Sequence, residues 1–252
     1  ALHRLGVRVG WTCDFGNDLF SQFVLSEVEK EGVDRSLLRI HDRPVRVFSL
    51  AFSYVNDRGF ISYMDRLEPV DRTRYVYEYR PKAVLLNALE TDPSGMALAK
   101  AVREVGGTLF VDSQSTDKTL DTPGAVELLR ATDVLMINTS EALALTGESD
   151  RDAAGKRLAE LTPLVVLKSG GDGAYAYTAD RVIHSPALKV EVVDTTGAGD
   201  CFNAGFIAAH LRGESLEMCL RLANICGGLS TTAHGTVTTP TLEEALQYIQ
   251  PV

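Results

Sequence analysis

Four short apolar segments between residues 83 and 168 constrain the fold more than any other feature of the chain. These segments are separated by stretches in which apolar residues recur at helical spacing. Strands that are apolar throughout and separated by helices indicate a parallel sheet with both faces covered, so we predict an α/β protein with right-handed crossovers. The expected strands are AVLLNAL (83–89), TLFVD (108–112), DVLMIN (133–138) and LVVLK (164–168), and the expected helices lie at 92–107, near 123–130, at 140–147 and near 152–160.

The beginning of the chain continues this pattern. A strand is expected at 7–13, and the opening residues ALHRLG have the pattern of a helix end closed by Gly6. We therefore expect residues of the same fold to precede Ala1. A helix is expected at 18–32, with an apolar face formed by Phe20, Phe23, Val24 and Val28.

One section interrupts the alternation of strands and helices. Residues 45–63 are rich in β-branched and aromatic side chains, and NDRG (56–59) is typical of a hairpin turn. We predict a small antiparallel β flap, about residues 42–66, inserted in a single domain that covers residues 1–252. Its aromatic residues could stack on a base or simply pack the flap; they are Phe48, Phe52, Tyr54 and Tyr63.

The composition excludes several classes of protein. The 252 residues carry a net charge of −9 and no basic run, which argues against a nucleic-acid or anionic-membrane surface. No apolar run is long enough to span a membrane, and no signal peptide is visible. The four cysteines form no CxxC pair, so we expect buried thiols in a reducing, cytoplasmic compartment.

Polar side chains stand at the ends of several expected strands. Asp112, Asn138, Lys168 and Asp194 each lie at or just past a strand end, the last after a Val-Val pair at 192–193. Because ligands of open parallel sheets bind at the carboxyl ends of the strands, these residues predict a binding rim.

The segment VVDTTGAGDCFNAGF (192–206) contains a glycine turn that opens a helix. Gly197 and Gly199 would let the backbone approach a ligand, and the free N–H groups of Ala198, Gly199 and Asp200 would form an anion hole. Asp200 would then take a proton from an attacking hydroxyl. The alternative is an ordinary helix entry with Asp200 as its cap. These residues alone leave the two interpretations about equal.

Two further motifs also have simple structural interpretations. In NTSE, Asn138 and Glu141 have the spacing of a capping box, although they could also organise Mg²⁺ near phosphates. In VLKSGGDGAYAY, a strand, a glycine-rich turn and a second strand would form a hairpin. Its residues Lys168, Gly170 and Gly173 could instead lie along a nucleotide.

These segments together resemble one known family. DTTGAGDCFNAGFI is similar to the second signature of the PfkB carbohydrate kinases, the ribokinase-like sugar and nucleoside kinases. NTSEALALTG resembles the family's N-x-x-E motif, and VVLKSGGDGAYAY resembles its strand–turn–strand on the nucleotide side. ANICGGLSTTAHGT (223–236) and VGWTCDFGNDLFSQFVLSEVEKEGVD resemble its late helix and the segment after its first glycine-rich motif. The order and spacing agree over essentially the whole chain.

The resemblance implies a ribokinase-like three-layer fold, with a central, mostly parallel sheet, helices on both faces and a small β lid. It implies transfer of the γ-phosphoryl of Mg-ATP to a sugar hydroxyl, with Asp200 as general base and an anion hole of Gly197, Ala198 and Gly199. It further implies that Asn138 and Glu141 serve the Mg²⁺–phosphate end, Glu141 through water. The residues expected near ATP are Lys168, Gly170, Gly173 and Asn224.

The resemblance also implies a monovalent-cation site, such as one for K⁺, at Asp194 and Thr196 with carbonyls in 231–235. Glu90 stands where some sugar kinases contact the acceptor. The flap corresponds to the family's lid, which closes over the acceptor and often pairs two subunits, so a homodimer is expected.

The chain departs from the family's pattern in two places. The family's opening strand and Gly-Gly…Asn motif are absent and should lie just before Ala1. VDSQST (111–116) stands where many sugar kinases have Asp-Pro-Asn-x-Arg, so only Asp112 fits. The substrate subclass therefore stays open. The alternatives are a nucleoside kinase of the same family and a non-catalytic binding or regulatory member.

Overall fold

The computed structural model describes residues 1–53, 58–114, 117–235 and 238–249. The chain forms two compact units, one of residues 8–71 and one of residues 1–7 with 72–252. Among the described residues, no helix has the length and apolar character needed to cross a membrane.

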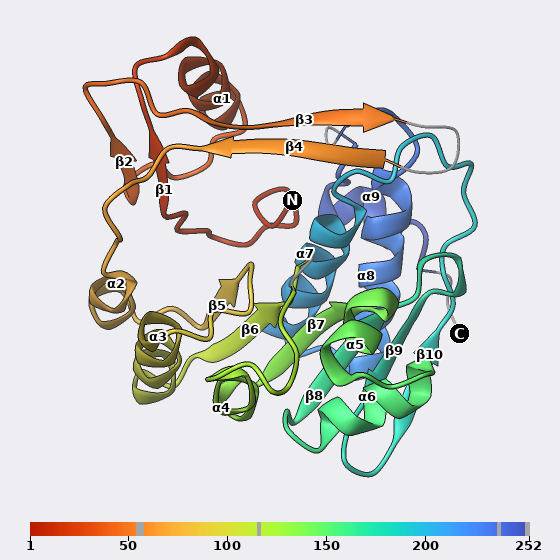
Figure 1. Ribbon diagram of the computed structural model, residues 1–252. Helices are drawn as coiled ribbons and strands as arrows, with labels where there is room; N and C mark the ends of the chain where they lie inside the picture. Colours follow the sequence, from red (N-terminus) through yellow and green to blue (C-terminus); the bar gives the residue numbers. More distant parts are fainter. Residues whose placement is uncertain (54–57, 115–116, 236–237, 250–252) are drawn as a thin grey trace. The chain divides into compact units, whose positions relative to one another are not determined.

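The larger unit is built on one sheet of six strands in the described residues, in the order β10-β9-β8-β7-β6-β5 (Figure 1). The first four in sequence pair in parallel, and β9 and β10 add antiparallel pairs at one edge. The prediction of a mostly parallel sheet is therefore confirmed. The bounds are β5 (Ala83–Leu86), β6 (Thr108–Asp112), β7 (Val134–Asn138), β8 (Leu164–Lys168), β9 (Ala174–Tyr177) and β10 (Val182–Ser185).

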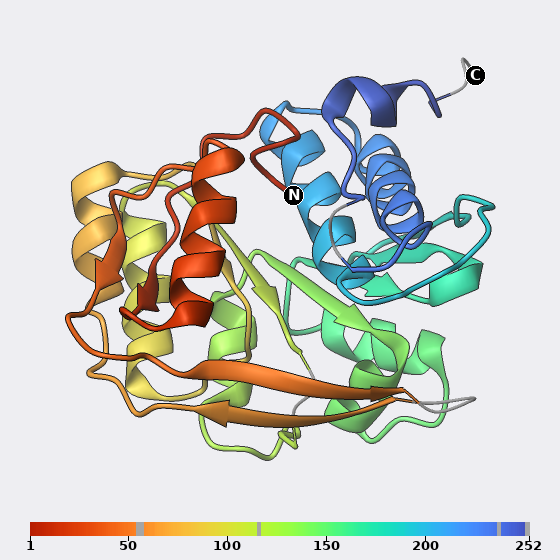
Figure 2. The same cartoon turned by 90° about the horizontal axis from the view of Figure 1, so that it is seen from above.

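Helices cover both faces of this sheet (Figures 1 and 2). Strand β6 shows why: Leu109 and Val111 join one buried apolar cluster, and Phe110 joins the other. Because successive side chains of a strand point to opposite faces, both clusters are needed to bury it. The first face carries α2 (Arg72–Tyr79), α3 (Pro93–Glu104), α4 (Ala125–Ala131), α5 (Thr139–Thr146) and α6 (Arg151–Ala159), and the second carries α7 (Ala198–Leu211), α8 (Leu216–Ser230) and α9 (Leu242–Leu246).

Helix α3 begins as its sequence predicts. Asp92 is the N-cap, its carboxylate accepts the Ser94 N–H at 2.7 Å, and Pro93 occupies the first helical position. A cap of this kind stabilises a helix by about 1 kcal/mol. Leu98, Ala101 and Val102 are buried, as expected for the face that packs on the sheet.

The smaller unit contains β1 (Cys13–Phe15), α1 (Leu19–Lys30), β2 (Leu38–Ile40), β3 (Val47–Ser53) and β4 (Arg58–Met64). Strands β1 and β2 pair in parallel, and β3 and β4 form a separate antiparallel ribbon. The antiparallel flap is therefore confirmed. Of its predicted turn, Arg58 and Gly59 belong to β4, whereas Asn56, Asp57 and the aromatic Tyr54 lie outside the described residues.

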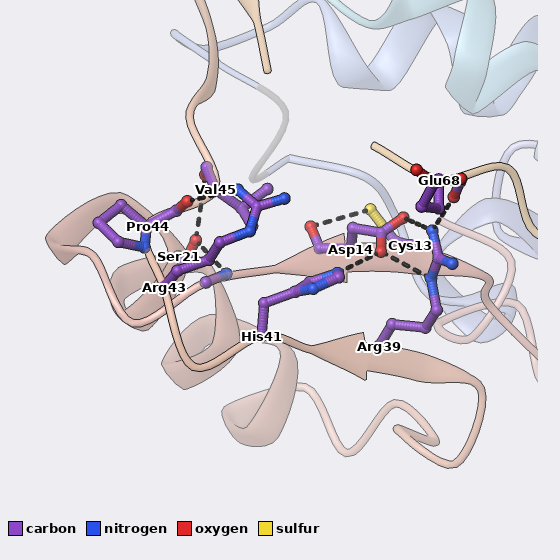
Figure 3. A network of polar contacts seen from close by, with 10 residues as sticks. Cys13, Asp14, Ser21, Arg39, His41, Arg43, Pro44, Val45 and Glu68 are labelled. Carbon is purple, nitrogen blue, oxygen red and sulfur yellow. Dashed lines mark hydrogen bonds and ion pairs between the residues drawn. The ribbon is translucent and has the colours of Figure 1, made fainter. Parts of the chain in front are cut away.

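A charged network holds the small parallel pair of strands together (Figure 3). The Asp14 carboxylate of β1 lies 2.7 Å from Arg39 Nε of β2 and 2.6 Å from His41 Nε2. Arg39 also donates to the Glu68 carbonyl at 2.7 Å. These partners keep the pKa of Asp14 below its usual value, although burial of the carboxyl acts against them.

Three local expectations are wrong. Residues 1–6 form turns and not the end of a regular helix. Of the strand expected at 7–13, only Cys13 lies in a strand, at the start of β1, where it pairs with β2. The Val-Val pair before Asp194 is not a strand: Val192 and Val193 are exposed, and Val193 N–H bonds to the Thr231 carbonyl of a loop. Asp194 therefore does not end a strand.

The apolar face expected on α1 is also largely unburied. Phe20 and Phe23 are each 63% exposed, and Val28 is the apolar residue of this helix that is buried. The helix itself begins with an N-cap, Asp18, whose carboxylate accepts the Ser21 N–H at 3.0 Å. Helical spacing predicted which residues share the face, but not what covers it.

Candidate active site

The glycine turn at 197–199 opens helix α7 without a side-chain cap. Gly197 is the N-cap, with φ +74°, a left-handed conformation that glycine adopts without strain. Asp200 is the third residue of the helix, so the interpretation of Asp200 as the N-cap is wrong. Ala198 N–H bonds to the Thr195 carbonyl at 3.2 Å, whereas the first-turn N–H groups of Gly199 and Asp200 have no intrahelical acceptor.

A lysine ammonium lies directly against this turn. A Cβ atom placed on Gly199 would be 3.6 Å from Lys168 Nζ. Lys168 ends β8, and Asn138 ends β7 beside it in register. The carboxyl edge of the parallel sheet and the positive end of α7 therefore meet at one point, where the Lys168 ammonium and the helix start both favour an anion.

The ammonium is held by two buried side chains. Lys168 Nζ lies 3.1 Å from Asp112 Oδ2 and donates to Asn203 Oδ1 at 3.3 Å. Asn203 Nδ2 in turn donates to Asp112 Oδ2. Asp112 is 6% exposed and Asn203 is 1% exposed, so each polar group must be satisfied within the protein. Side chains from β6, β8 and α7 thus form one closed network.

The Asp200 carboxyl is perturbed by its surroundings. The residue as a whole is exposed, but neighbouring protein atoms desolvate its carboxyl, and this raises its pKa above the usual value. The Asp112 carboxylate raises the pKa further, and the Lys168 ammonium lowers it. A helix start alone would favour the ionised form. Here desolvation outweighs that effect, so the pKa of Asp200 is raised.

Asn138 and Glu141 form the capping box that their spacing predicts. Asn138 Oδ1 accepts the Glu141 N–H at 2.9 Å, and Glu141 Oε2 accepts the Asn138 N–H at 3.2 Å. The same Glu141 oxygen also accepts the Ser113 hydroxyl at 2.6 Å. Both hydrogen bonds that the Glu141 carboxylate accepts go to Oε2, and they fix the carboxylate at the rim beside β6.

A cavity of about 520 Å³ opens beside this rim. Arg151 lies at it, with its guanidinium carbon 3.7 Å from the centre of the Tyr175 ring. The stacking and an ion pair to Asp152 at 2.9 Å hold the guanidinium in place. The lining residues are Asn138, Thr139, Ser140, Arg151, Lys168, Ser169, Gly170 and Asp172. The cavity thus combines two cations with several hydrogen-bonding groups.

The glycine-rich hairpin after β8 has the form that the sequence predicts. A short 3₁₀ turn, η1 (Gly170–Asp172), links β8 to the antiparallel β9. Gly170 lines the cavity, whereas Gly173 packs against the backbone at 185–187. Asn224 of α8 is buried and donates to the Ser185 carbonyl at 2.9 Å. Gly173 and Asn224 thus both contact the end of β10, and neither is among the residues that line the cavity.

Replacing Gly173 by alanine should destabilise the protein. The new Cβ would lie 2.1 Å from the Ser185 carbonyl oxygen, and φ of +93° is rarely adopted by residues with a side chain. We expect a loss of roughly 2 kcal/mol or more in the free energy of unfolding, measured by chemical denaturation. Gly171→Ala is the matched control, because its Cβ meets nothing within 4 Å. Equal stability of the two variants would contradict the prediction.

The structure brings the two parts of the expected cation site together. Asp194 Oδ1 accepts the Thr196 N–H and Asp194 Oδ2 accepts the Gly235 N–H, each at 2.9 Å. The Thr231 carbonyl accepts the N–H groups of Val193 and Asp194. The loop at 193–196 is therefore tied to the loop at 231–235, as a shared site requires.

Glu90 is engaged by an arginine. Arg72 Nη1 donates to Glu90 Oε1 at 2.8 Å, and Arg72 Nη2 pairs with Oε2. A two-pronged pair of this kind occupies both carboxylate oxygens and raises the pKa of Arg72. The predicted contact between Glu90 and an acceptor stays a prediction.

Sequence reasoning missed three residues of the site: Ser113, Arg151 and Asn203. Asn203 follows Asp200 by three positions, so helical spacing places the two on one side of α7 and could have identified it. Ser113 directly follows Asp112 at the end of β6. Arg151 carried no motif, because its place depends on how α6 packs beside β9.

The sequence that forms this site matches a known family. The profile that describes the pfkB family of carbohydrate kinases matches residues 1–243. The chain belongs to this family. The kinase is therefore a phosphotransferase with an alcohol group as acceptor.

Three similar proteins place the kinase within its family. It is 30% identical to the ATP-dependent ribose-1-phosphate kinase of Halopiger xanaduensis, over 99% of this chain and 83% of the relative. It is 28% identical to the aminoimidazole riboside kinase of Salmonella typhimurium, over 93% and 80% of the two chains. A structure of an E. coli protein described as a candidate ribokinase II, with ATP and Mg²⁺, matches with a TM-score of 0.80 at 27% identity, over 99% and 85%. The ribokinase-like fold is thereby confirmed.

Proposed function

We propose that the enzyme transfers the γ-phosphoryl group of Mg-ATP to a hydroxyl of a small sugar or sugar derivative, with Asp200 as general base. The observation that carries this proposal is the glycine turn of α7, where Asp200 and the Lys168 ammonium stand together. A base and a cation at one helix start are what in-line phosphoryl transfer requires.

Groups of the chain can take up the proton and stabilise the negative charge that the proposed transfer moves. The acceptor hydroxyl gives its proton to the Asp200 carboxylate, its oxygen forms the new bond to the γ-phosphorus, and ADP leaves as the old bond breaks. Lys168 and the N–H groups of Gly199 and Asp200 hold the charge of the transferred group. The raised pKa of Asp200 supports this role, because a base works best when its pKa lies closer to the working pH.

The residues at the rim fit Mg-ATP. Lys168, Gly170 and Arg151 offer cationic and backbone groups to phosphates, and the cavity of about 520 Å³ has room for part of a nucleotide. Asn138 and Glu141 would hold Mg²⁺ at the phosphate end, Glu141 through water. Gly173 and Asn224 would support the nucleotide side from the end of β10. The structural neighbour that contains ATP and Mg²⁺ supports the choice of cofactor.

The substrate class is tested by ADP release with Mg-ATP and K⁺ across pentoses, hexoses, sugar acids, sugar phosphates and nucleosides. We expect one sugar or sugar phosphate to give the largest kcat/KM. The riboside kinase among the relatives favours the alternative of a nucleoside kinase, which preferential turnover of nucleosides would establish. ATP binding with no turnover of any acceptor would support a non-catalytic member and contradict the proposal.

We further propose a monovalent-cation site at Asp194 and Thr196 with carbonyls of residues 231–235. Because Asp194 joins the two loops next to the glycine turn, a bound K⁺ would stabilise the anion hole. Activity should be several-fold higher in K⁺ than in Na⁺, and Asp194→Ala should abolish that difference. Equal rates of the wild type in both salts would contradict this proposal.

One exposed side of the β3–β4 ribbon supports a proposed homodimer. Register places Phe48 opposite Tyr63 and Leu50 opposite Ile61 on one side of the ribbon, and all four are between 46% and 64% exposed. An exposed apolar surface of this kind is typical of protein interfaces.

We also propose that residues 1–252 form a single kinase domain and that the protein is cytoplasmic. Four free cysteines support the cytoplasmic location.

The dimer is tested by one substitution on each side of β3. Leu50→Glu should convert the protein to a monomer in analytical ultracentrifugation, because it places a charge on the apolar side. Ser49→Glu, on the opposite side of the same strand, should leave the dimer intact. A monomeric wild-type protein would refute the proposal.

A further inference from the structure

We propose that Asp112 is a positioning residue for phosphoryl transfer: with Asn203, its buried carboxylate holds the Lys168 ammonium at the glycine turn and balances the charge around Asp200. The proposal rests on the proposed function, with Asp200 as base. It gives a role to Asp112 although the rest of its segment departs from the family's pattern.

The hydrogen bonds among Asp112, Lys168 and Asn203 fix the three side chains in one arrangement. Asp112 Oδ2 receives both Lys168 Nζ, at 3.1 Å, and Asn203 Nδ2, while Asn203 Oδ1 accepts from Lys168 at 3.3 Å. Each of the three side chains contacts the other two. Because the Lys168 side chain is only 14% exposed, its ammonium cannot move far without losing partners inside the protein.

The closed network also explains why the amide is needed. A buried lysine paired with one carboxylate would retain donors that face protein atoms. Asn203 supplies an acceptor for the ammonium and a donor for the carboxylate, because a side-chain amide carries both an oxygen and an NH₂ group. Asn203 stands one helical turn after Asp200, so α7 links the network rigidly to the base.

The charges that act on Asp200 come from two side chains. Asp112 at the end of β6 raises its pKa, and Lys168 at the end of β8 lowers it. Desolvation of the carboxyl is the largest effect and raises the pKa. Asp112 and Lys168 therefore act in opposite directions, so removing each charge should move the titration of Asp200 in opposite directions.

The test is the pH profile of kcat/KM for ATP and for the best acceptor, whose acid limb reports the essential base of the free enzyme. Asp112→Asn should move this limb to lower pH, by roughly half a unit or more. Lys168→Met should move it to higher pH, and Lys168→Arg, which keeps the charge, should leave it near the wild-type position. Asp112→Asn should also lower kcat/KM about 10- to 100-fold, since Lys168 loses its fixed position.

Asp133→Asn is the matched control. Asp133 precedes β7 at the opposite end of the same sheet and accepts the Leu109 N–H at 2.7 Å, so the substitution removes a carboxylate charge far from the rim. Its acid limb should coincide with that of the wild type. The ionisation of ATP is the same in every variant and cancels in the comparison.

Opposite movements of the limb in Asp112→Asn and Lys168→Met would support the proposal. A folded Asp112→Asn protein with an unmoved limb would overturn it, while the kinase assignment would stand. If Asp112→Asn does not fold, the two Lys168 variants decide: equal limbs in Lys168→Met and Lys168→Arg would overturn the proposal. Failure of the proposed function itself would show separately, as full turnover by Asp200→Asn.

Discussion

Asp200→Asn should lower kcat by about 10²- to 10⁴-fold, because an amide cannot take the proton of the acceptor hydroxyl. Affinity for ATP, measured by calorimetry, should change little, since the N–H groups of the glycine turn and Lys168 remain. The free energy of unfolding should also stay close to that of the wild type. Gly197, not Asp200, is the N-cap of α7, and the residue is exposed.

Asp150→Asn provides the control for this change. Asp150 caps α6 by accepting the Ala153 N–H at 2.9 Å, and asparagine caps a helix equally well. This variant should keep wild-type turnover. If Asp200→Asn were as active as Asp150→Asn, Asp200 would not be the base.

The pH dependence of the wild type follows from the same residue. The pKa of Asp200 is raised, mainly by desolvation and then by Asp112. Because the ionised form is the base, activity should fall as the pH drops through this raised pKa. The acid limb should therefore lie above the ordinary aspartate value of about 3.9. A limb at or below that value would contradict the assigned direction.

Lys168→Ala should have the second large effect, on both nucleotide binding and stability. The KM for ATP should rise about 10- to 100-fold, more than the KM for the acceptor, because the ammonium lines the cavity beside the phosphate end. The substitution also leaves Asp112 buried without its cation. We expect a loss of about 3–5 kcal/mol in the free energy of unfolding, measured by denaturant titration.

Lys156→Ala is the corresponding control, since Lys156 is exposed on α6. It should change neither the KM for ATP nor stability by a measurable amount. A larger rise in the KM of the acceptor than in that of ATP for Lys168→Ala would contradict its placement on the nucleotide side.

The predictable part of this protein is the part that local patterns encode. The apolar runs at 108–112, 133–138 and 164–168 became β6, β7 and β8 almost residue for residue. The capping box that the spacing of Asn138 and Glu141 predicts is also confirmed. Caps and periodicity depend on contacts within a few residues, so they are visible without the fold.

The failures have a common physical cause. Val192 and Val193 have strand propensity, but they lie in no strand, and the N–H of Val193 bonds to the Thr231 carbonyl of a loop. The apolar face of α1 has helical spacing, but Phe20 and Phe23 are exposed. Propensity gives each residue a preference, and only the available partners decide whether it is satisfied.

By itself, the sequence determined the parallel sheet, the helices on its two faces, the β ribbon and the glycine turn that presents Asp200. Only the tertiary structure decided that Lys168 meets Asp112, 56 residues away, and that Asn203, 91 residues from Asp112, closes the network. Periodicity is a local property of the chain, whereas this meeting depends on the register of β6 and β8 and on where α7 packs against them. The electrostatics of the base follow from that packing, and no motif records them.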